Sequence, residues 1–103
     1  MRVWRFELQT VTRQVVDIPL PAEIIHAGTV DGKINVWAIV QPKEGGYKRP
    51  VELELYRTGE PFQDLDDTEY RAHIATVKTR AMGTGPVHVF QVLERPEGYR
   101  DEW

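Results

Sequence analysis

Histidine and carboxylate are the residue types here that could carry acid–base or metal chemistry, since the sequence contains neither cysteine nor serine. Threonine is therefore the only residue left for the usual nucleophilic step of acyl transfer. The three histidines, His26, His73 and His88, lie in separate segments without the close spacing that preorganises a metal site. We expect each to be a structural histidine, with no metal, no other cofactor and no catalytic residue. Catalysis by His26 or His88 with a nearby acid is the open alternative.

The carboxylates show patterns typical of solvent-facing surfaces. Glu52 and Glu54 lie two apart, so they would share one face of a strand, which we expect to be solvated. Asp64, Asp66 and Asp67 look like part of a calcium loop, but the glycine and distal glutamate of that pattern are missing. We expect a solvated loop there.

Aromatic and basic residues give the strongest indication of a binding site. Planar rings next to guanidinium groups can stack on a base and pair with a phosphate. The residues concerned are Trp4, Trp37, Tyr47 and Tyr56, with Arg2, Arg5, Lys48, Arg49 and Arg57 among them. The alternative is that the two tryptophans fill the core. If Trp37 instead shares a face with His26, that face is a candidate for an exposed apolar patch, hence an interface.

A basic island interrupts the acidic half of the chain. Residues 51–103 hold six basic and eleven acidic residues, yet Arg71, Lys78 and Arg80 fall in one short segment. The following Gly83-Thr84-Gly85 could present backbone N–H groups to a phosphate, but it lacks the Lys-Ser/Thr of a P-loop, so we expect a hairpin turn. A surface strand with scattered charges is the alternative. The residues that we predict to bind a ligand are Trp37, His26, Arg71, Lys78 and Arg80.

These residues must be positioned by β-strands. No segment shows an apolar helical period over three turns, whereas runs of β-branched and aromatic residues recur and end at Gly or Pro. We predict one all-β domain over residues 1–93, an antiparallel β-sandwich or small barrel of six or seven strands. Residues 94–103, with four acidic groups, are expected to be a flexible, mobile tail.

The strands are expected where residue types alternate. In residues 3–8, Trp4, Phe6 and Leu8 share one face, and in residues 51–58 the apolar positions from Val51 to Leu55 point inward. Further strands are predicted over residues 11–18, 70–79 and 86–93, with loops over residues 43–50 and 63–69.

The clearest local pattern is a hairpin over residues 24–40. Asp31-Gly32 suits a two-residue type I′ turn, because both central residues need positive φ. The register then places Thr29 opposite Ile34, Ala27 opposite Val36 and Ile25 opposite Ala38, which we expect in the core. The other face pairs Gly28 with Asn35, His26 with Trp37, and Ile24 with Ile39.

Charge and hydropathy limit the partners. The net charge of −3 argues against non-specific nucleic-acid binding through a broad basic surface. The longest apolar run, residues 36–40, is far shorter than the roughly 18 residues of a membrane span. The first residues lack the apolar stretch of a signal peptide. We expect a cytoplasmic protein.

Residues 18–94 resemble a family of small uncharacterised proteins from bacteriophages, prophages and related mobile elements. The resemblance lies in the order of short motifs: Ile18-Pro19-Leu20-Pro21, Ile24-Ile25-His26, Asp31-Gly32-Lys33, Val36-Trp37-Ala38-Ile39-Val40, Tyr56-Arg57-Thr58-Gly59-Glu60-Pro61 and Val87-His88-Val89-Phe90-Gln91-Val92. It implies a phage setting inside a bacterial host cell, with no settled activity. Phage accessory proteins of this size often bind a host component, including components of antiviral defence.

Three functions follow as hypotheses. The first is a non-enzymatic counter-defence protein that sequesters a nucleotide-derived host immune signal in a homo-oligomer, by stacking and charge-assisted hydrogen bonds. The second is a protein–protein inhibitor or adaptor that docks on a host defence enzyme through the acidic loop at residues 60–69 and the tail with its terminal tryptophan. The third is a small nucleotide-processing enzyme.

Overall fold

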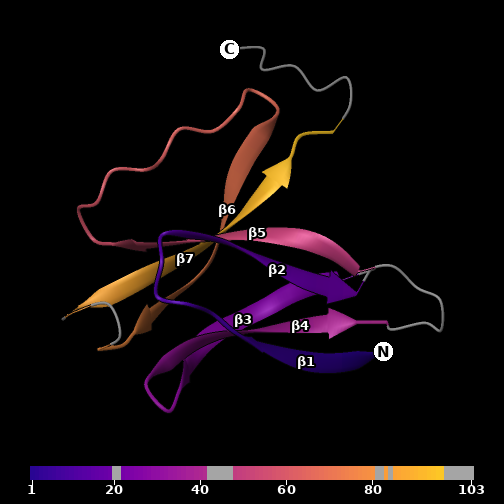
Figure 1. The fold of residues 1–103 in the computed structure, drawn as a ribbon, viewed down its shortest axis with the longest axis horizontal. Coiled ribbons are helices and arrows are strands. Elements are labelled where there is room, and N and C mark those ends of the chain that lie inside the picture. The colour runs from indigo at the N-terminus through magenta and orange to yellow at the C-terminus, as the bar shows by residue number, and fades with distance from the viewer. Residues whose placement is uncertain (20–21, 42–47, 81–82, 84, 97–103) are drawn as a thin grey trace.

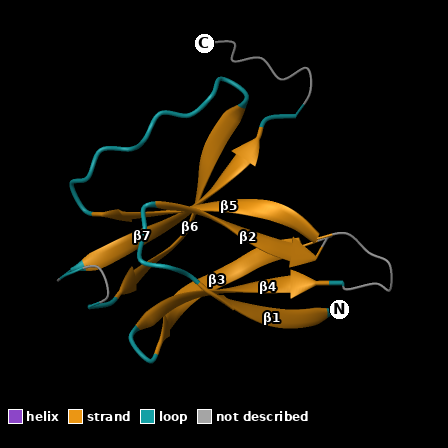
Figure 2. Ribbon diagram, viewed as in Figure 1, coloured by secondary structure: helices purple, strands orange, loops and turns teal. Residues whose placement is uncertain are grey.

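The computed structural model describes residues 1–19, 22–41, 48–80, 83 and 85–96, and these form seven strands in two antiparallel sheets (Figures 1 and 2). The three-stranded sheet has the order β1-β4-β3, and the four-stranded sheet has the order β2-β5-β7-β6. The predicted all-β sandwich is confirmed. The described residues contain no helix that could cross a membrane. The strands are β1 (Arg2–Glu7), β2 (Arg13–Pro19), β3 (Ala22–Val30), β4 (Lys33–Val40), β5 (Lys48–Arg57), β6 (Glu69–Lys78) and β7 (Pro86–Glu94).

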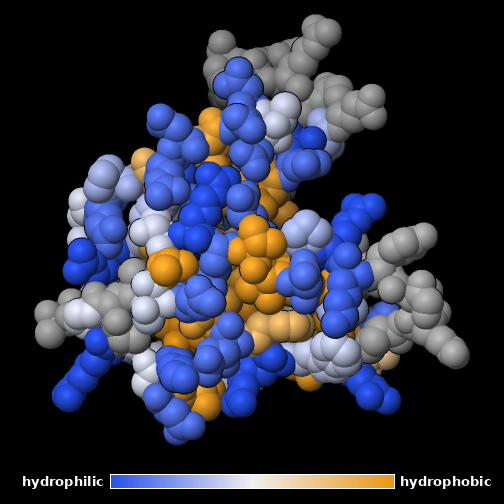
Figure 3. Space-filling model, in the orientation of Figure 1, coloured by the Kyte–Doolittle hydropathy of each residue, from blue (hydrophilic) through white to orange (hydrophobic). Residues whose placement is uncertain are grey.

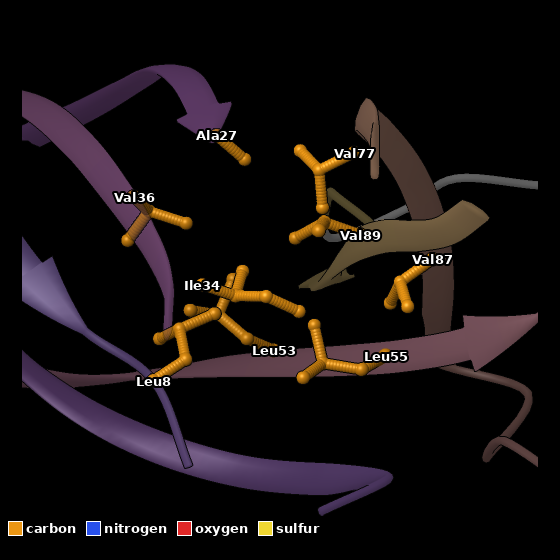
Figure 4. Packing of buried hydrophobic residues seen from close by; sticks show 9 residues of the cluster. All are labelled: Leu8, Ala27, Ile34, Val36, Leu53, Leu55, Val77, Val87 and Val89. Atoms are coloured by element: carbon orange, nitrogen blue, oxygen red, sulfur yellow. The ribbon is translucent and has the colours of Figure 1, made fainter. Parts of the chain in front are cut away.

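The core lies between the inner faces of the two sheets (Figure 4). Alternate residues of each strand point to opposite faces, so the aliphatic positions of β4, β5 and β7 meet in the middle. Trp4 and Phe6 pack against this core from β1, as their spacing predicts. On the face seen in Figure 3, hydrophobic residues show mostly towards the middle, among hydrophilic residues that also form most of the rim. The main buried cluster contains Leu8, Ala27, Ile34, Val36, Leu53, Leu55, Val77, Val87 and Val89.

The β3–β4 hairpin confirms most of the predicted register. Asp31 and Gly32 have φ of 51° and 79°, as a type I′ turn requires. His26 lies opposite Trp37, and the pairs from there to the turn are as expected. Two expectations for the core were wrong, since Ile25 is 48% exposed and Thr29 is exposed as well. The register also shifts between Ile24 and His26, so the residue opposite Ile39 is Glu23 and not Ile24. This bulge turns Ile24 towards the core and places it opposite Ala38.

The fifth strand begins earlier than its sequence suggests. Residues 48–50, expected in a loop, pair with the end of β2, and Pro50 lies opposite Asp17. The N–H of Leu55 bonds to the carbonyl of Thr12, so the alternation of the ladder makes Pro50 and Asp17 a pair without mutual hydrogen bonds. Proline is tolerated there because that position needs no N–H donor. Residues 43–47, including Tyr47, lie outside the described residues.

The four-stranded sheet has an outer face that is partly covered by residues 59–68, which make up most of the connection between β5 and β6. Phe62 packs edge-on against Tyr56 and Phe90 of that face, with ring centroids 4.9 and 5.2 Å apart. The N–H of Gln63 donates to the Tyr56 hydroxyl at 3.1 Å. Glu54 beneath is fully buried, so the expectation of a solvated carboxylate was wrong at this residue.

The described end of the chain is tied to this connection. Glu94 is the last residue of β7, and the N–H of Arg95 donates to the carbonyl of Thr68 at 2.7 Å. Residue 94, expected to begin the tail, therefore belongs to the sheet. Residues 97–103 lie outside the described residues.

Candidate anion-binding clefts

Two clefts meet at the end of the four-stranded sheet where β5 and β6 finish and β7 begins. The first, here the Lys78 cleft, has a volume of about 390 Å³ and is lined by Lys78, Thr79, Arg80, Gly85 and Pro86. The second, here the Thr58 cleft, has a volume of about 410 Å³ and is lined by Arg57, Thr58, Gly59, Glu60 and Pro86. Pro86 belongs to both, so the two clefts are neighbours.

The Lys78 cleft combines two exposed cations with a fixed wall. Within the described part of the chain, neither Lys78 nor Arg80 has a carboxylate within ion-pair distance. Thr79 between them donates its hydroxyl to the carbonyl of Gly32 at 3.1 Å, which fixes the end of β6 against the β3–β4 turn. The arrangement can therefore offer charge to an anion without first breaking an internal ion pair.

The Thr58 cleft is shaped by a tight turn. The Arg57 guanidinium donates from Nε to Glu60 at 2.8 Å, and the Arg57 N–H reaches the same oxygen at 2.9 Å. These hydrogen bonds lower the pKa of the Glu60 carboxyl. Gly59 takes the positive φ of 90° that the turn needs. The charge of Arg57 is thus largely compensated within the cleft.

A chain of hydrogen bonds runs from the Thr58 cleft across the outer face of the sheet. Thr58 Oγ1 lies 2.8 Å from His88 Nε2, and Thr76 Oγ1 lies 2.9 Å from His88 Nδ1. Thr76 also lies 3.0 Å from His73 Nε2. If the Thr76 hydroxyl donates to His73, it accepts from His88 Nδ1, and the free Nε2 lone pair then faces the Thr58 hydroxyl. This places a candidate base beside a candidate nucleophile. Among the described residues, the other ring nitrogen of His88 bonds to Thr76 and not to a carboxylate.

Arg71, a predicted ligand-binding residue, is occupied by the protein itself. Its Nε donates to the buried Glu54 at 2.5 Å, its Nη2 donates to the carbonyl of Gln63, and its guanidinium carbon lies 4.5 Å from the ring centroid of Phe62. The carboxylate raises the pKa of the Arg71 guanidinium, and burial raises the pKa of the Tyr56 phenol in the same cluster. These contacts hold the connection 59–68 onto the sheet.

His26 and Trp37 lie together on the outer face of the three-stranded sheet. Their ring centroids are 5.3 Å apart, and Arg5 of β1 lies opposite Trp37. A cation, an indole and an imidazole therefore form a row across three strands. Gly28 leaves room beside them, since a Cβ there would lie 3.2 Å from His26 Nε2 and 3.5 Å from Trp37.

The five predicted ligand residues thus fall into three places. Lys78 and Arg80 share a cleft, His26 and Trp37 share a face of the other sheet, and Arg71 sits in an internal ion pair. His73 and His88 come together through Thr76, although they are far apart in the sequence. Among the described residues, no group of three metal-ligating side chains forms.

Sequence reasoning missed the contribution of Thr58, Thr79 and Pro86 to the clefts. Their neighbourhood depends on which strand ends lie side by side, and no local pattern carries that information. The Thr-Gly-Glu-Pro turn at residues 58–61 was a visible signal for a rigid loop, but not for a cleft.

Comparison with known proteins places the chain in a family. No curated protein and no solved structure matches it. The family described as Domain of unknown function (DUF7352) matches residues 1–99, nearly the whole chain. The chain therefore belongs to this family of domains of unknown function.

Proposed function

We propose that this protein is a non-enzymatic binding protein that captures a phosphate-bearing, nucleotide-like small molecule. The observation that carries the proposal is the Lys78 cleft, where Lys78 and Arg80 line one concave site without a carboxylate partner among the described residues. The cleft volume of about 390 Å³ lies within the range of small-molecule sites.

The chemistry of the lining suits a phosphate group. A lysine supplies a point charge and an arginine supplies a planar fork of donors, which together favour a doubly charged anion. Pro86 gives an apolar wall against which a ring or sugar can pack. The net charge of −3 for the whole chain disfavours a long polyanion, so a small ligand fits better than a nucleic acid.

The biological setting of the proposal comes from the resemblance to phage proteins. In that setting, the captured molecule is a nucleotide-derived immune signal of the bacterial host, and sequestration in a homo-oligomer needs affinity but no chemistry. The row of Arg5, Trp37 and His26 is a second place where a base could stack.

Calorimetric titration tests the proposal directly. The probes are ADP-ribose, a cyclic dinucleotide and inorganic phosphate. At least one nucleotide is expected to bind, with phosphate alone weaker. Lys78→Ala and Arg80→Ala should each weaken binding about tenfold or more, because each removes a charge-assisted hydrogen bond. Arg2→Ala, which removes an exposed cation from β1, is the matched control and should leave binding unchanged. Silence from every probe would overturn the proposal.

A second candidate function rests on the hydrogen bond between Thr58 and His88. In it, the Thr58 hydroxyl gives its proton to His88 Nε2 and attacks a phosphoryl or acyl group held in the Thr58 cleft. The bond from that group to its leaving group breaks, the leaving group takes the proton from His88, and water then hydrolyses the ester on Thr58. Incubation of the bound nucleotide with the protein, followed by chromatography, separates the two candidates. Capture returns the ligand intact, whereas processing yields a product that Thr58→Val abolishes.

A further inference from the structure

The edge of the four-stranded sheet formed by β2 offers a backbone ladder. Among the residues that the structure describes, β2 pairs with β5 on one side and with no strand on the other. The hydrogen bond from the Leu55 N–H to the Thr12 carbonyl shows that the backbone groups of Thr12 point towards β5, and every second residue after it does the same. By alternation these are Gln14, Val16 and Ile18, so Arg13, Val15 and Asp17 direct their N–H and C=O groups away from the sheet. An edge of this kind is a template for another strand.

The side chains of these three residues are self-complementary. They lie on one face of β2, spaced two apart, with a cation at one end, an acid at the other and an apolar residue between them. Val15 is 59% exposed, so its side chain is accessible to a partner strand. Reversing the strand about Val15 exchanges the positions of Arg13 and Asp17.

We propose that a second copy of the chain pairs with this edge, β2 against β2 in antiparallel orientation about a two-fold axis. Val15 lies opposite Val15 of the partner subunit, and Arg13 lies opposite Asp17 of the partner subunit. The three outward-pointing residues of each strand then exchange backbone hydrogen bonds, and two cross-strand ion pairs form on the outer face. The two four-stranded sheets become one continuous sheet.

The charges select this register. A slip of one residue would point the side chains of the two strands to opposite faces. A slip of two residues would set Arg13 against Val15 or Pro19 of the partner subunit, according to its direction, and leave the acid without its cation. Arg13 already donates from Nε and Nη2 to Glu52, at 2.9 and 2.8 Å. Its Nη2 also lies 4.0 Å from Glu69 Oε1. Among the described residues no hydrogen bond engages its Nη1, which remains for a carboxylate on the other side of the strand.

The other edges of the sandwich suit a second copy less well. On β1 the bond from the Leu8 N–H to Ile34 directs the backbone of Val3, Arg5 and Glu7 outward. Pairing centred on Arg5 would set two arginines against each other, which is destabilising. β3 and β6, at the remaining edges, pack against one another.

Sedimentation equilibrium of the full chain over a range of concentrations tests the dimer. A single strand pair buries less than the roughly 1,200 Å² of a stable interface, so the dimer should dissociate on dilution. Val15→Lys should give a monomer, because two lysines would then face each other across the interface. The variant should still fold, since Glu52 lies opposite residue 15 on β5 of the same chain and can pair with the lysine. Val3→Lys, on the exposed β1 edge, is the matched control and should leave the dimer intact.

Mixing charge variants tests the register. Asp17→Arg alone and Arg13→Asp alone each place like charges together and should be monomeric. Their mixture should form a heterodimer, since every cross-strand pair is then opposite in charge. Circular dichroism confirms that each variant is folded; if Arg13→Asp is unfolded, Val15→Lys and Asp17→Arg decide. A wild-type monomer at every concentration, or a dimer that Val15→Lys leaves unchanged, would overturn the inference. A monomer would also remove the homo-oligomer from the proposed function. Neither result bears on ligand binding at the Lys78 cleft, whose residues lie elsewhere in the chain, so titration with nucleotides tests that part separately.

Discussion

The Nε of Arg71 lies 2.5 Å from the carboxylate of Glu54, which is completely buried while the arginine side chain is 15% exposed. The pair spans the outer face of the four-stranded sheet from β6 to β5. The Tyr56 hydroxyl donates to the same carboxylate at 2.8 Å. A carboxylate in this position is stable only because its partners replace the water that it has lost.

Arg71→Ala is therefore expected to destabilise the fold by about 3 kcal/mol, because it leaves a buried carboxylate without its cation. Urea unfolding followed by tryptophan fluorescence measures the change. The double variant Glu54→Gln with Arg71→Met keeps an acceptor for Tyr56 without the buried charge, and should lose less than half as much. Equal losses in the two variants would contradict the role given to this ion pair.

Gly32→Ala should cost about 1–2 kcal/mol of stability, since an L-residue is strained at the φ of 79° that Gly32 adopts. Asp31→Gly, at the neighbouring turn position, is the control and should change stability by less than about 0.5 kcal/mol. Thermal melts of the two variants would decide. An alanine tolerated at residue 32 would show that the hairpin does not depend on this turn.

Leu53→Ala should destabilise the protein by about 2–5 kcal/mol, because Leu53 is fully buried between the sheets. Val3→Ala removes an aliphatic side chain that is 57% exposed, and should stay within about 0.5 kcal/mol of the wild type. Chemical denaturation of both proteins tests the placement of the core. Similar losses for the two would mean that the core lies elsewhere.

Glu60 should titrate below its ordinary pKa of 4.5 because Arg57 donates two hydrogen bonds to its carboxylate. Because the pKa of Glu60 is lower in the folded state than in the unfolded state, its interaction with Arg57 stabilises the fold above pH 4.5. This stabilisation is lost as the pH falls through the folded-state pKa. Carbon-detected NMR of the Glu60 carboxyl follows this directly. In Arg57→Ala the pKa should rise towards 4.5, and no rise would rule out the guanidinium as the cause.

Local patterns were enough to predict much of the fold. The Asp31-Gly32 pair fixed both the turn and the register of the hairpin near it, because turn geometry alone determines which residues face each other. Alternation of apolar and polar residues in β1 and β5 identified the core positions, because alternate residues of a strand point to opposite faces of the sheet. The bulge at Ile25 could not be predicted from the sequence, since it depends on the packing of Ile24 against residues of the core that are distant in the chain.

The candidate site could be predicted only in part, because it depends on contacts between residues that are far apart in the sequence. Glu54 looked like a solvated carboxylate because nothing near it in the chain shows that residues 59–68 fold back over it. Arg71 looked available for a ligand because its partner lies 17 residues away. Lys78 and Arg80 were identified as a pair, since they are close in sequence at the end of β6, where the cleft lies.

The hydrogen bond from Thr79 to Gly32 makes the wall of the Lys78 cleft common to both layers of the sandwich. A molecule bound by Lys78 and Arg80 would therefore also stabilise the contact between the two sheets at this point. Amide exchange at the tip of the hairpin should slow when the cleft is filled, so the hairpin tip would act as a remote reporter of occupancy.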